Sequence, residues 1–382
     1  MSIALQHGRV LTEQGFREDL AVLVEGDRIT ALLDANDARL RDVAVHDLDG
    51  CHLLPGFIDA QVNGGGGVLL NDQPTVEGVA TIARAHRRFG TTGLLPTLIS
   101  DSVEVIERAI AAVDAAIQAG VPGVLGIHIE GPYLAEARKG VHDPAQFRVP
   151  DAAELELVSA LRHGRTLITV APERVGPGII ARLVAKGIVV AAGHTAGSYS
   201  EIRAGLAAGV SGFTHLFNAM TPMGSREPGV VGAALEDPAS WCGIIVDGHH
   251  VHPASVRVAL AAKPRGKVFL VTDAMPPVGA DDPSFQLNGE TITVRDGICQ
   301  AASGSLAGSA LDMAQAVRNT IEMLGLPLDE AARMASTYPA DFLGISHQRG
   351  RIRVGLKADF TVLDHDLMVR ETWIDGHCQR AA

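Results

Sequence analysis

Ionisable side chains follow several short apolar runs of this sequence, at the point where each run ends. Glu130 follows the run 124–129, His194 follows 187–191, and His215 lies just after 209–214. A carboxylate and two imidazoles that converge from different strands match a catalytic zinc-type site, which leaves one position for water. The other polar residues at such ends are Gln61, Asn63, Glu173, His249, His250 and Asp273.

Each of these residues, taken singly, is better explained as a hydrogen-bonded side chain of the core or of a loop. The whole set is not well explained in this way, because eight strands rarely end in so many ionisable groups unless those groups have a function. We therefore interpret the set as a functional site.

The elements that must position these residues alternate between short apolar runs and Ala-rich segments with helical spacing. Segments 103–118 and 200–208 are two of the predicted helices. This alternation predicts an α/β fold with a parallel sheet, and eight units favour a closed barrel, in which catalytic groups come from the carboxyl ends of the strands. An Asn-Gly turn at 288–289 predicts an extra hairpin after the eighth strand. The eight runs are 55–60, 92–97, 124–129, 166–170, 187–191, 209–214, 242–246 and 267–271.

Both ends of the chain are rich in predicted strands. Runs 20–24 and 28–32 near the start, and 351–354, 359–363 and 371–374 near the end, are separated by turn signals. We expect residues 1–52 and 346–382 to pair into one small β domain, with the barrel at 53–345 inserted between them.

Composition narrows the possible partners. The 382 residues are 47% hydrophobic and carry 32 Lys and Arg against 44 Asp and Glu, a formal charge of -12. No Lys/Arg-rich run is present, so we expect no nucleic-acid partner. The sequence has no signal-peptide pattern and no apolar run of about 18 residues, and the four cysteines form no C-x-x-C pair, so we predict a cytoplasmic protein without a membrane partner.

Seven ordered motifs carry a resemblance to a known family. They are PGFID at 55–59, HIEGPY at 128–133, AGHT at 192–195, THLFNAM at 214–220, REPG at 226–229, VTDA at 271–274 and SLAGS at 305–309. On these motifs the chain resembles the N-acetylglucosamine-6-phosphate deacetylases of the amidohydrolase superfamily over essentially its whole length. The resemblance implies a distorted (β/α)8 TIM-like barrel with a small β domain formed by both chain ends.

The resemblance also assigns roles. It implies that Glu130, His194 and His215 bind a divalent metal, that metal-bound water is the nucleophile, and that Asp273 is the general acid/base. His142 resembles the family's substrate histidine, which polarises the acetyl carbonyl; the alternative is an ordinary loop histidine.

The first strand departs from the wider superfamily. Where a H-x-H pair would often bind a second metal, this chain has Gln61-Val62-Asn63, and the fourth strand offers no lysine to bridge two ions. Because amides are weak ligands, we predict one divalent metal ion per subunit, with zinc first and iron, manganese or cobalt as alternatives.

Further positions match the family's substrate site. Arg226 and His250, with Asn218 and Ala219 on the adjacent loop, stand where the family binds the sugar phosphate. The family's arginine reaches the neighbouring subunit's site, so the resemblance implies a homodimer; the alternative for Arg226 is a solvated loop charge. Leu306, Ala307 and Gly308 resemble the segment that lines the sugar pocket, although a plain Gly/Ser turn would look the same.

The resemblance implies hydrolysis of N-acetyl-D-glucosamine 6-phosphate to D-glucosamine 6-phosphate and acetate. Two alternatives remain open. One is deacylation of another acylated amino sugar, such as N-acetylgalactosamine 6-phosphate. The other is a non-catalytic scaffold, against which the joint presence of four buried ionisable groups argues.

Overall fold

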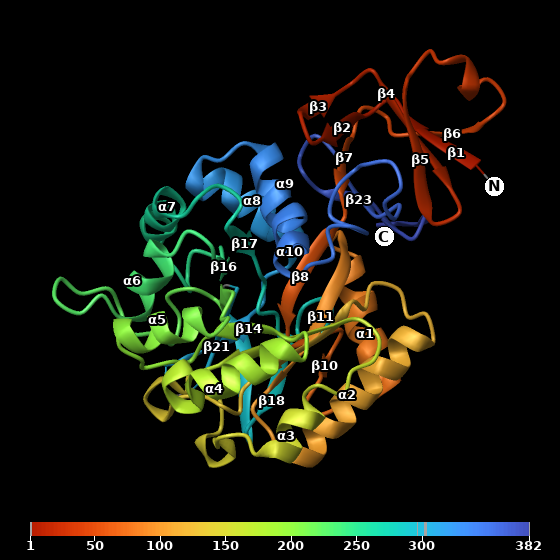
Figure 1. The fold of residues 1–382 in the computed structure, drawn as a ribbon. Coiled ribbons are helices and arrows are strands. Elements are labelled where there is room, and N and C mark those ends of the chain that lie inside the picture. The colour runs from red at the N-terminus through yellow and green to blue at the C-terminus, as the bar shows by residue number, and fades with distance from the viewer. Residues whose placement is uncertain (1, 296, 302–303, 382) are drawn as a thin grey trace.

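The computed structural model describes residues 2–295, 297–301 and 304–381, and an eight-stranded parallel sheet forms its centre (Figure 1). Each strand pairs with the next in chain order, and every one of the eight predicted runs overlaps an observed strand. The strands are β8 (Phe57–Val62), β11 (Thr91–Ile99), β12 (Gly126–Glu130), β13 (Arg165–Val170), β14 (Val189–Ala192), β15 (Gly212–Phe213), β16 (Trp241–Ile244) and β17 (Val268–Leu270).

The seam between β17 and β8 closes the sheet just beyond the end of β17. Val62 and Ala274 form a parallel bridge, and the Asp273 amide donates to the Gln61 carbonyl at 3.0 Å. The Thr272 hydroxyl donates to the buried carboxylate of Asp59 at 2.6 Å. The predicted distorted (β/α)8 barrel is therefore confirmed.

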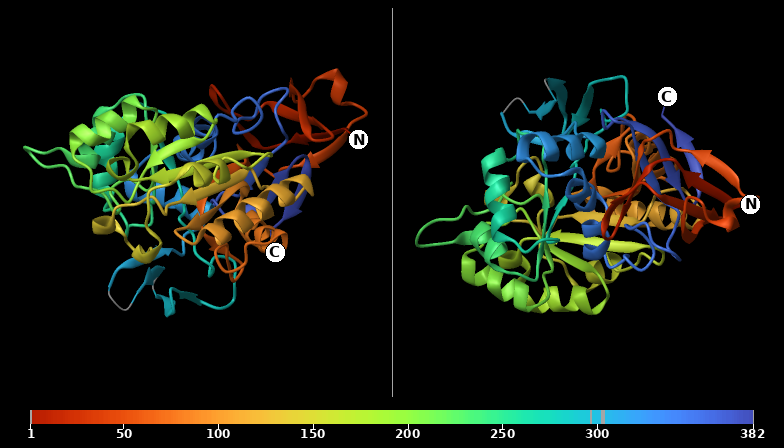
Figure 2. Two further views of the ribbon diagram at one scale, coloured as in Figure 1. Left: turned by 60° about the horizontal axis from the view of Figure 1, so that its bottom comes forward. Right: turned by 90° about the horizontal axis from the view of Figure 1, so that it is seen from above.

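Helices cover the outside of the barrel (Figures 1 and 2). In α2, the buried residues Ile106, Ala109, Ile110 and Val113 recur at helical spacing, and Ser102 accepts from the Val105 amide at the N-terminus. This helix has the bounds predicted from the sequence. The helices are α1 (Val76–Arg87), α2 (Val103–Gln118), α3 (Ala152–Leu157), α4 (Pro172–Ala185), α5 (Tyr199–Ala207), α6 (Gly229–Glu236), α7 (Pro253–Ala262), α8 (Met313–Leu324), α9 (Leu328–Ala335) and α10 (Thr337–Phe342).

A small β domain, which contains both chain termini, packs beside the barrel (Figure 2). One of its sheets has the order β5-β4-β1-β6 and the other β24-β23-β22-β7-β2-β3, so that β7 from the N-terminal part pairs antiparallel with β22 from the C-terminal part. The exact limits at 52/53 and 345/346 stay a prediction. The strands are β1 (Ser2–Gln6), β2 (Arg9–Thr12), β3 (Gly15–Arg17), β4 (Leu20–Glu25), β5 (Arg28–Asp34), β6 (Ala44–Asp47), β7 (His52–Pro55), β22 (Phe360–Leu363), β23 (Val369–Ile374) and β24 (His377–Arg380).

The strand expected at 351–354 is not formed. Ile352 is buried in the core of the small domain, but the chain then turns at Gly355, whose amide donates to the Ile29 carbonyl. Of the two apolar residues in this run only Ile352 is buried, while Val354 is 51% exposed, so the alternation of charged and apolar residues did not mark a strand here.

The hairpin expected after the eighth strand is present and extends into a four-stranded antiparallel sheet. Asn288 and Gly289 both have positive φ, 50° and 79°, as a two-residue hairpin turn of type I′ requires. The strands of this sheet are β18 (Ser284–Leu287), β19 (Glu290–Arg295), β20 (Ile298–Gln300) and β21 (Leu306–Ser309), and a short pair, β9 (Gly64–Gly65) and β10 (Val68–Leu69), follows β8.

In the described part of the chain no helix is long and apolar enough to cross a membrane.

Candidate active site

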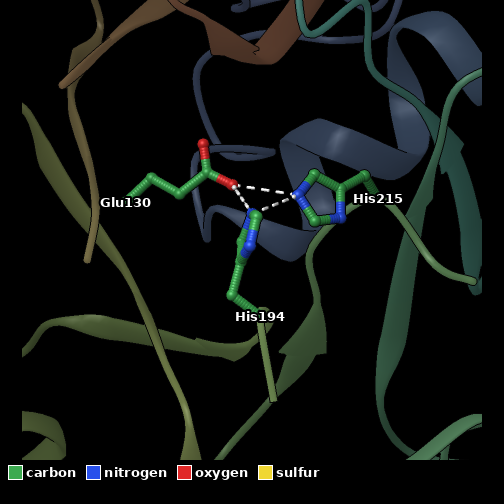
Figure 3. A group of neighbouring side chains, drawn as sticks. All are labelled: Glu130, His194 and His215. Atoms are coloured by element: carbon green, nitrogen blue, oxygen red, sulfur yellow. Dashed lines mark hydrogen bonds and ion pairs between the residues drawn. The ribbon is translucent and has the colours of Figure 1, made fainter. Parts of the chain in front are cut away.

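The three predicted metal ligands meet at the carboxyl ends of their strands (Figure 3). Glu130 ends β12, while His194 and His215 lie two residues beyond β14 and β15. Glu130 Oε1 is 3.2 Å from His194 Nε2 and 3.0 Å from His215 Nε2, and the two imidazole nitrogens are 3.1 Å apart. All three side chains are at least 94% buried.

The backbone at these strand ends is strained in a way that aims the side chains inward. The φ angles of His194, His215 and Asp273 are 45°, 32° and 54°. They lie in the left-handed region of backbone conformation, which residues other than glycine rarely adopt. Gly193 lets the chain approach β13 closely, because a Cβ there would lie 2.6 Å from the Thr169 methyl. Strain of this kind clusters at functional sites.

The donor set fits a divalent cation. The Arg138 carbonyl, which can only accept, lies 2.8 Å from His194 Nδ1, so this nitrogen carries the proton and Nε2 presents its lone pair to the cluster. The three ligand atoms are 3.0–3.2 Å apart. This is close to the roughly 3.3 Å that separates two ligand atoms of a tetrahedral metal ion with bonds of 2.0–2.1 Å. Burial acts to raise the pKa of Glu130, but the two imidazoles beside it, His194 and His215, outweigh burial and hold that pKa well below its usual range.

A second carboxylate, Asp273, lies beside the cluster. Gln61 Nε2 donates to Glu130 Oε2 and to Asp273 Oδ1, both at 3.1 Å, and Asn63 Nδ2 donates to the same Asp273 oxygen at 2.6 Å. The two amides of the first strand therefore serve as donors to carboxylates. Burial, followed by the negative charge of Glu130, raises the pKa of Asp273.

His142 reaches the same cleft from the loop after β12. Its ring centroid is 4.4 Å from that of His194, and the side chain is buried. The Ser100 amide donates to His142 Nδ1 at 3.2 Å and the Ser100 hydroxyl lies 2.8 Å from it. Because an amide can only donate, the proton of the neutral imidazole sits on Nε2. Burial, followed by the neighbouring His194, lowers the pKa of His142 well below its usual value, which keeps the ring neutral.

These residues line one cleft of about 1180 Å³ at the carboxyl ends of the strands. Its wall includes other predicted substrate residues, and the sheet β18–β21 supplies part of it. Gly308 has φ of 64° and packs against the main chain of Asp273, where a Cβ would come within 2.9 Å of the Asp273 carbonyl oxygen. The predicted site residues on this wall are Glu130, His142, His194, His215, Asn218, Ala219, His250, Asp273, Leu306 and Gly308.

Two predicted substrate residues do not line this cleft, and two polar residues at strand ends have other contacts. Ala307 is buried within an apolar cluster, and Arg226 is exposed on the loop that projects before α6 (Figure 1). Glu173 accepts from the Thr195 hydroxyl and the Ala196 amide, which makes it a loop-holding residue. His249 is exposed and outside the cleft wall.

Sequence reasoning missed the residues that orient the imidazoles. Ser100 and Asp247 each hydrogen-bond to the Nδ1 of a histidine in the cleft, His142 and His250. Asp247 lies three residues from its partner and follows a predicted strand, a local signal that could have been used. Ser100 is 42 residues from His142, so only the fold joins them.

The barrel and its buried carboxylate–imidazole cluster define a hydrolase-type barrel that can hold a divalent cation. Comparisons with known proteins agree. The amidohydrolase family matches residues 52–378. The chain is 44% identical over 372 residues to the N-acetylgalactosamine-6-phosphate deacetylase of Shewanella sp. (strain ANA-3), with 96% of this chain and 93% of that one covered. It is 35% identical over 372 residues to the N-acetylglucosamine-6-phosphate deacetylase of Vibrio furnissii, covering 96% and 92%.

The crystal structure of N-acetylglucosamine-6-phosphate deacetylase from Pasteurella multocida superimposes with a TM-score of 0.96 at 35% identity, covering 100% of both chains. The chain therefore belongs to the amidohydrolase family, and within it to the amino-sugar-6-phosphate deacetylases.

Proposed function

We propose that this protein hydrolyses the N-acetyl group of N-acetyl-D-glucosamine 6-phosphate, giving D-glucosamine 6-phosphate and acetate. The observation that carries the proposal is the buried cluster of Glu130, His194 and His215 in the same cleft as Asp273 and His142. The names of its relatives supply the substrate class.

The cluster would hold the cation and Asp273 would move the proton. A divalent cation on these ligands would lower the pKa of a bound water and supply hydroxide near neutral pH. Asp273 Oδ1 accepts from both Gln61 and Asn63, which leaves Oδ2 for proton transfer. Asp273 takes a proton from the attacking water and returns it to the sugar nitrogen as the C–N bond breaks, because an amine leaves poorly as an anion.

His142 would bind the acetyl carbonyl. With Ser100 donating to Nδ1, the ring offers its Nε2–H, and a hydrogen bond from this group to the carbonyl oxygen strengthens as negative charge develops there.

We propose one cation per subunit, zinc first, with iron, manganese or cobalt as alternatives. Gln61 and Asn63 stand where a pair of imidazoles would bind a second ion, and amides are weak ligands. Both amides already donate hydrogen bonds to carboxylates.

We further propose that His250, Asn218 and Ala219 bind the phosphate of the substrate and that the 306–308 segment lines the sugar pocket. Arg226 would reach the phosphate in the site of a second subunit in a homodimer. The exposure of Arg226 on a projecting loop supports this role. Cytoplasmic location is also part of the proposal, supported by the four free cysteines.

The galactosamine epimer is a second candidate substrate, favoured by the 44% identity to a protein named for it. Acetate release by metal-replete protein from the two epimeric 6-phosphates and from unphosphorylated N-acetylglucosamine tests the proposal. We expect release from N-acetylglucosamine 6-phosphate and much less from the unphosphorylated sugar. Preference for the galactosamine epimer would shift the assignment to it, and no release despite bound metal would favour another amide or a scaffold.

A further inference from the structure

Asp247 and His250 form a buried pair at the edge of the cleft. The loop after β16 carries both, and their side chains are 7% and 6% exposed. His250 Nδ1 lies 2.6 Å from Asp247 Oδ2, while Asp247 Oδ1 accepts from the backbone amides of His249 at 2.9 Å and His250 at 2.8 Å.

The arrangement fixes which nitrogen of His250 can meet a ligand. Burial acts to raise the pKa of Asp247, but the hydrogen bonds from His250 outweigh it and lower the pKa to about 2, so the carboxylate is anionic and can only accept. His250 Nδ1 therefore carries a proton. Because His250 lines the cleft, Nε2 is the nitrogen left for a bound molecule.

The loop has a separate anchor in α8. The amide of the buried Asn319 donates to the Val246 carbonyl at 2.8 Å, and Gln315 donates to Asn319 at 2.7 Å. The path of the loop thus does not depend on Asp247 alone, and a change of the Asp247 side chain can alter the imidazole without releasing the main chain.

We propose that Asp247 is a positioning residue for substrate binding, which holds His250 so that Nε2 contacts the phosphate of the amino-sugar phosphate. This inference rests on the proposed function. With Nδ1–H bonded to the carboxylate, a second proton on Nε2 gives an imidazolium that donates to a phosphate oxygen, and Asp247 balances its charge.

A double-mutant cycle tests the proposal. Asp247→Asn keeps an oxygen for the two backbone amides but replaces the acceptor of His250 Nδ1–H with a donor. We expect KM for the phosphorylated substrate to rise at least tenfold with kcat changed by less than threefold, and we expect this effect to disappear in a His250→Ala background.

Asp237→Asn is a matched control. Asp237 accepts from the amides of Ala239 and Ser240, two and three residues on, as Asp247 does in its own turn, and it does not line the cleft. We expect this variant to keep the wild-type KM. An unchanged KM in Asp247→Asn, or an equal rise in the His250→Ala background, would overturn the positioning role.

A second measurement separates this inference from the proposed function. Long-range 1H–15N spectra of the metal-replete protein, with His250 assigned by its absence in His250→Ala, report the protonated nitrogen directly. We expect Nδ1–H in the wild type and its loss in Asp247→Asn. An Nδ1–H that persists in Asp247→Asn would refute the inference even if acetate release is normal. The expected change in a protein that releases no acetate would overturn only the proposed function.

Discussion

The amide of Gln61 offers the sharpest test of how this site is built. One nitrogen donates to both Glu130 Oε2 and Asp273 Oδ1 at 3.1 Å, so it holds two buried carboxylates together. Gln61→Leu has a similar volume and removes both bonds. A hydrogen bond to a charged group contributes about 1.5–3 kcal/mol, so we expect the free energy of unfolding to fall by about 3 kcal/mol after partial relaxation.

Activity should fall as well, because Asp273 loses one of its two amide donors. We expect kcat to drop about 100-fold with little change in KM, since general acid–base catalysis contributes about 10²–10⁴ and Asn63 still holds the carboxylate. Urea unfolding and acetate release by metal-replete protein measure the two effects.

Gln61→Glu is the matched variant, with the same shape and a negative charge. A third carboxylate 3.1 Å from the other two would meet repulsion of about 5 kcal/mol per pair at an effective dielectric constant of 20. We expect this variant to take up a second equivalent of divalent metal.

The Gln61→Leu variant decides whether the amide holds these carboxylates together. If it kept the wild-type kcat and an unfolding free energy within about 0.5 kcal/mol of the wild-type value, the amide would not have this role.

Two further substitutions probe the active site, and a third probes a buried histidine of the fold. Glu130→Gln removes the anionic ligand, so metal content by elemental analysis should fall well below that of the wild type, whereas the exposed His249→Gln should retain it; equal metal content would contradict the ligand assignment. Asp273→Asn should lower kcat about 10²–10⁴-fold without loss of metal, and a wild-type kcat would remove Asp273 from the chemistry. Burial lowers the pKa of His86 to about 4, and its Nε2 lies 2.9 Å from the Gly64 carbonyl. The unfolded state therefore binds the extra proton below pH 6.5, and stability falls as pH drops. Between pH 7 and pH 5 the wild type should lose about 2 kcal/mol more than His86→Gln in urea unfolding; parallel losses would exclude this origin.

The order and type of the barrel strands, the metal-ligand candidates and the hairpin at Asn288-Gly289 could all be predicted from the amino-acid sequence. These depend on local information. A strand-end residue such as Glu130 or His194 is recognised from the few apolar residues before it, and parallel strands bring such ends to one face in any closed barrel.

Which groups pair across that face could not be predicted and depends on how the barrel closes. Gln61 meets Asp273 from 212 residues away because β8 and the segment after β17 close the barrel, and Ser100 meets His142 because the loop after β12 returns to the end of β11. The register of β21 likewise sends Leu306 and Gly308 to the cleft and Ala307 into an apolar cluster. Side-chain pairing of this kind depends on the register between strands that are distant in the sequence. A shift of one residue would turn each side chain of a strand to the other face of the sheet, and local sequence patterns do not encode that register.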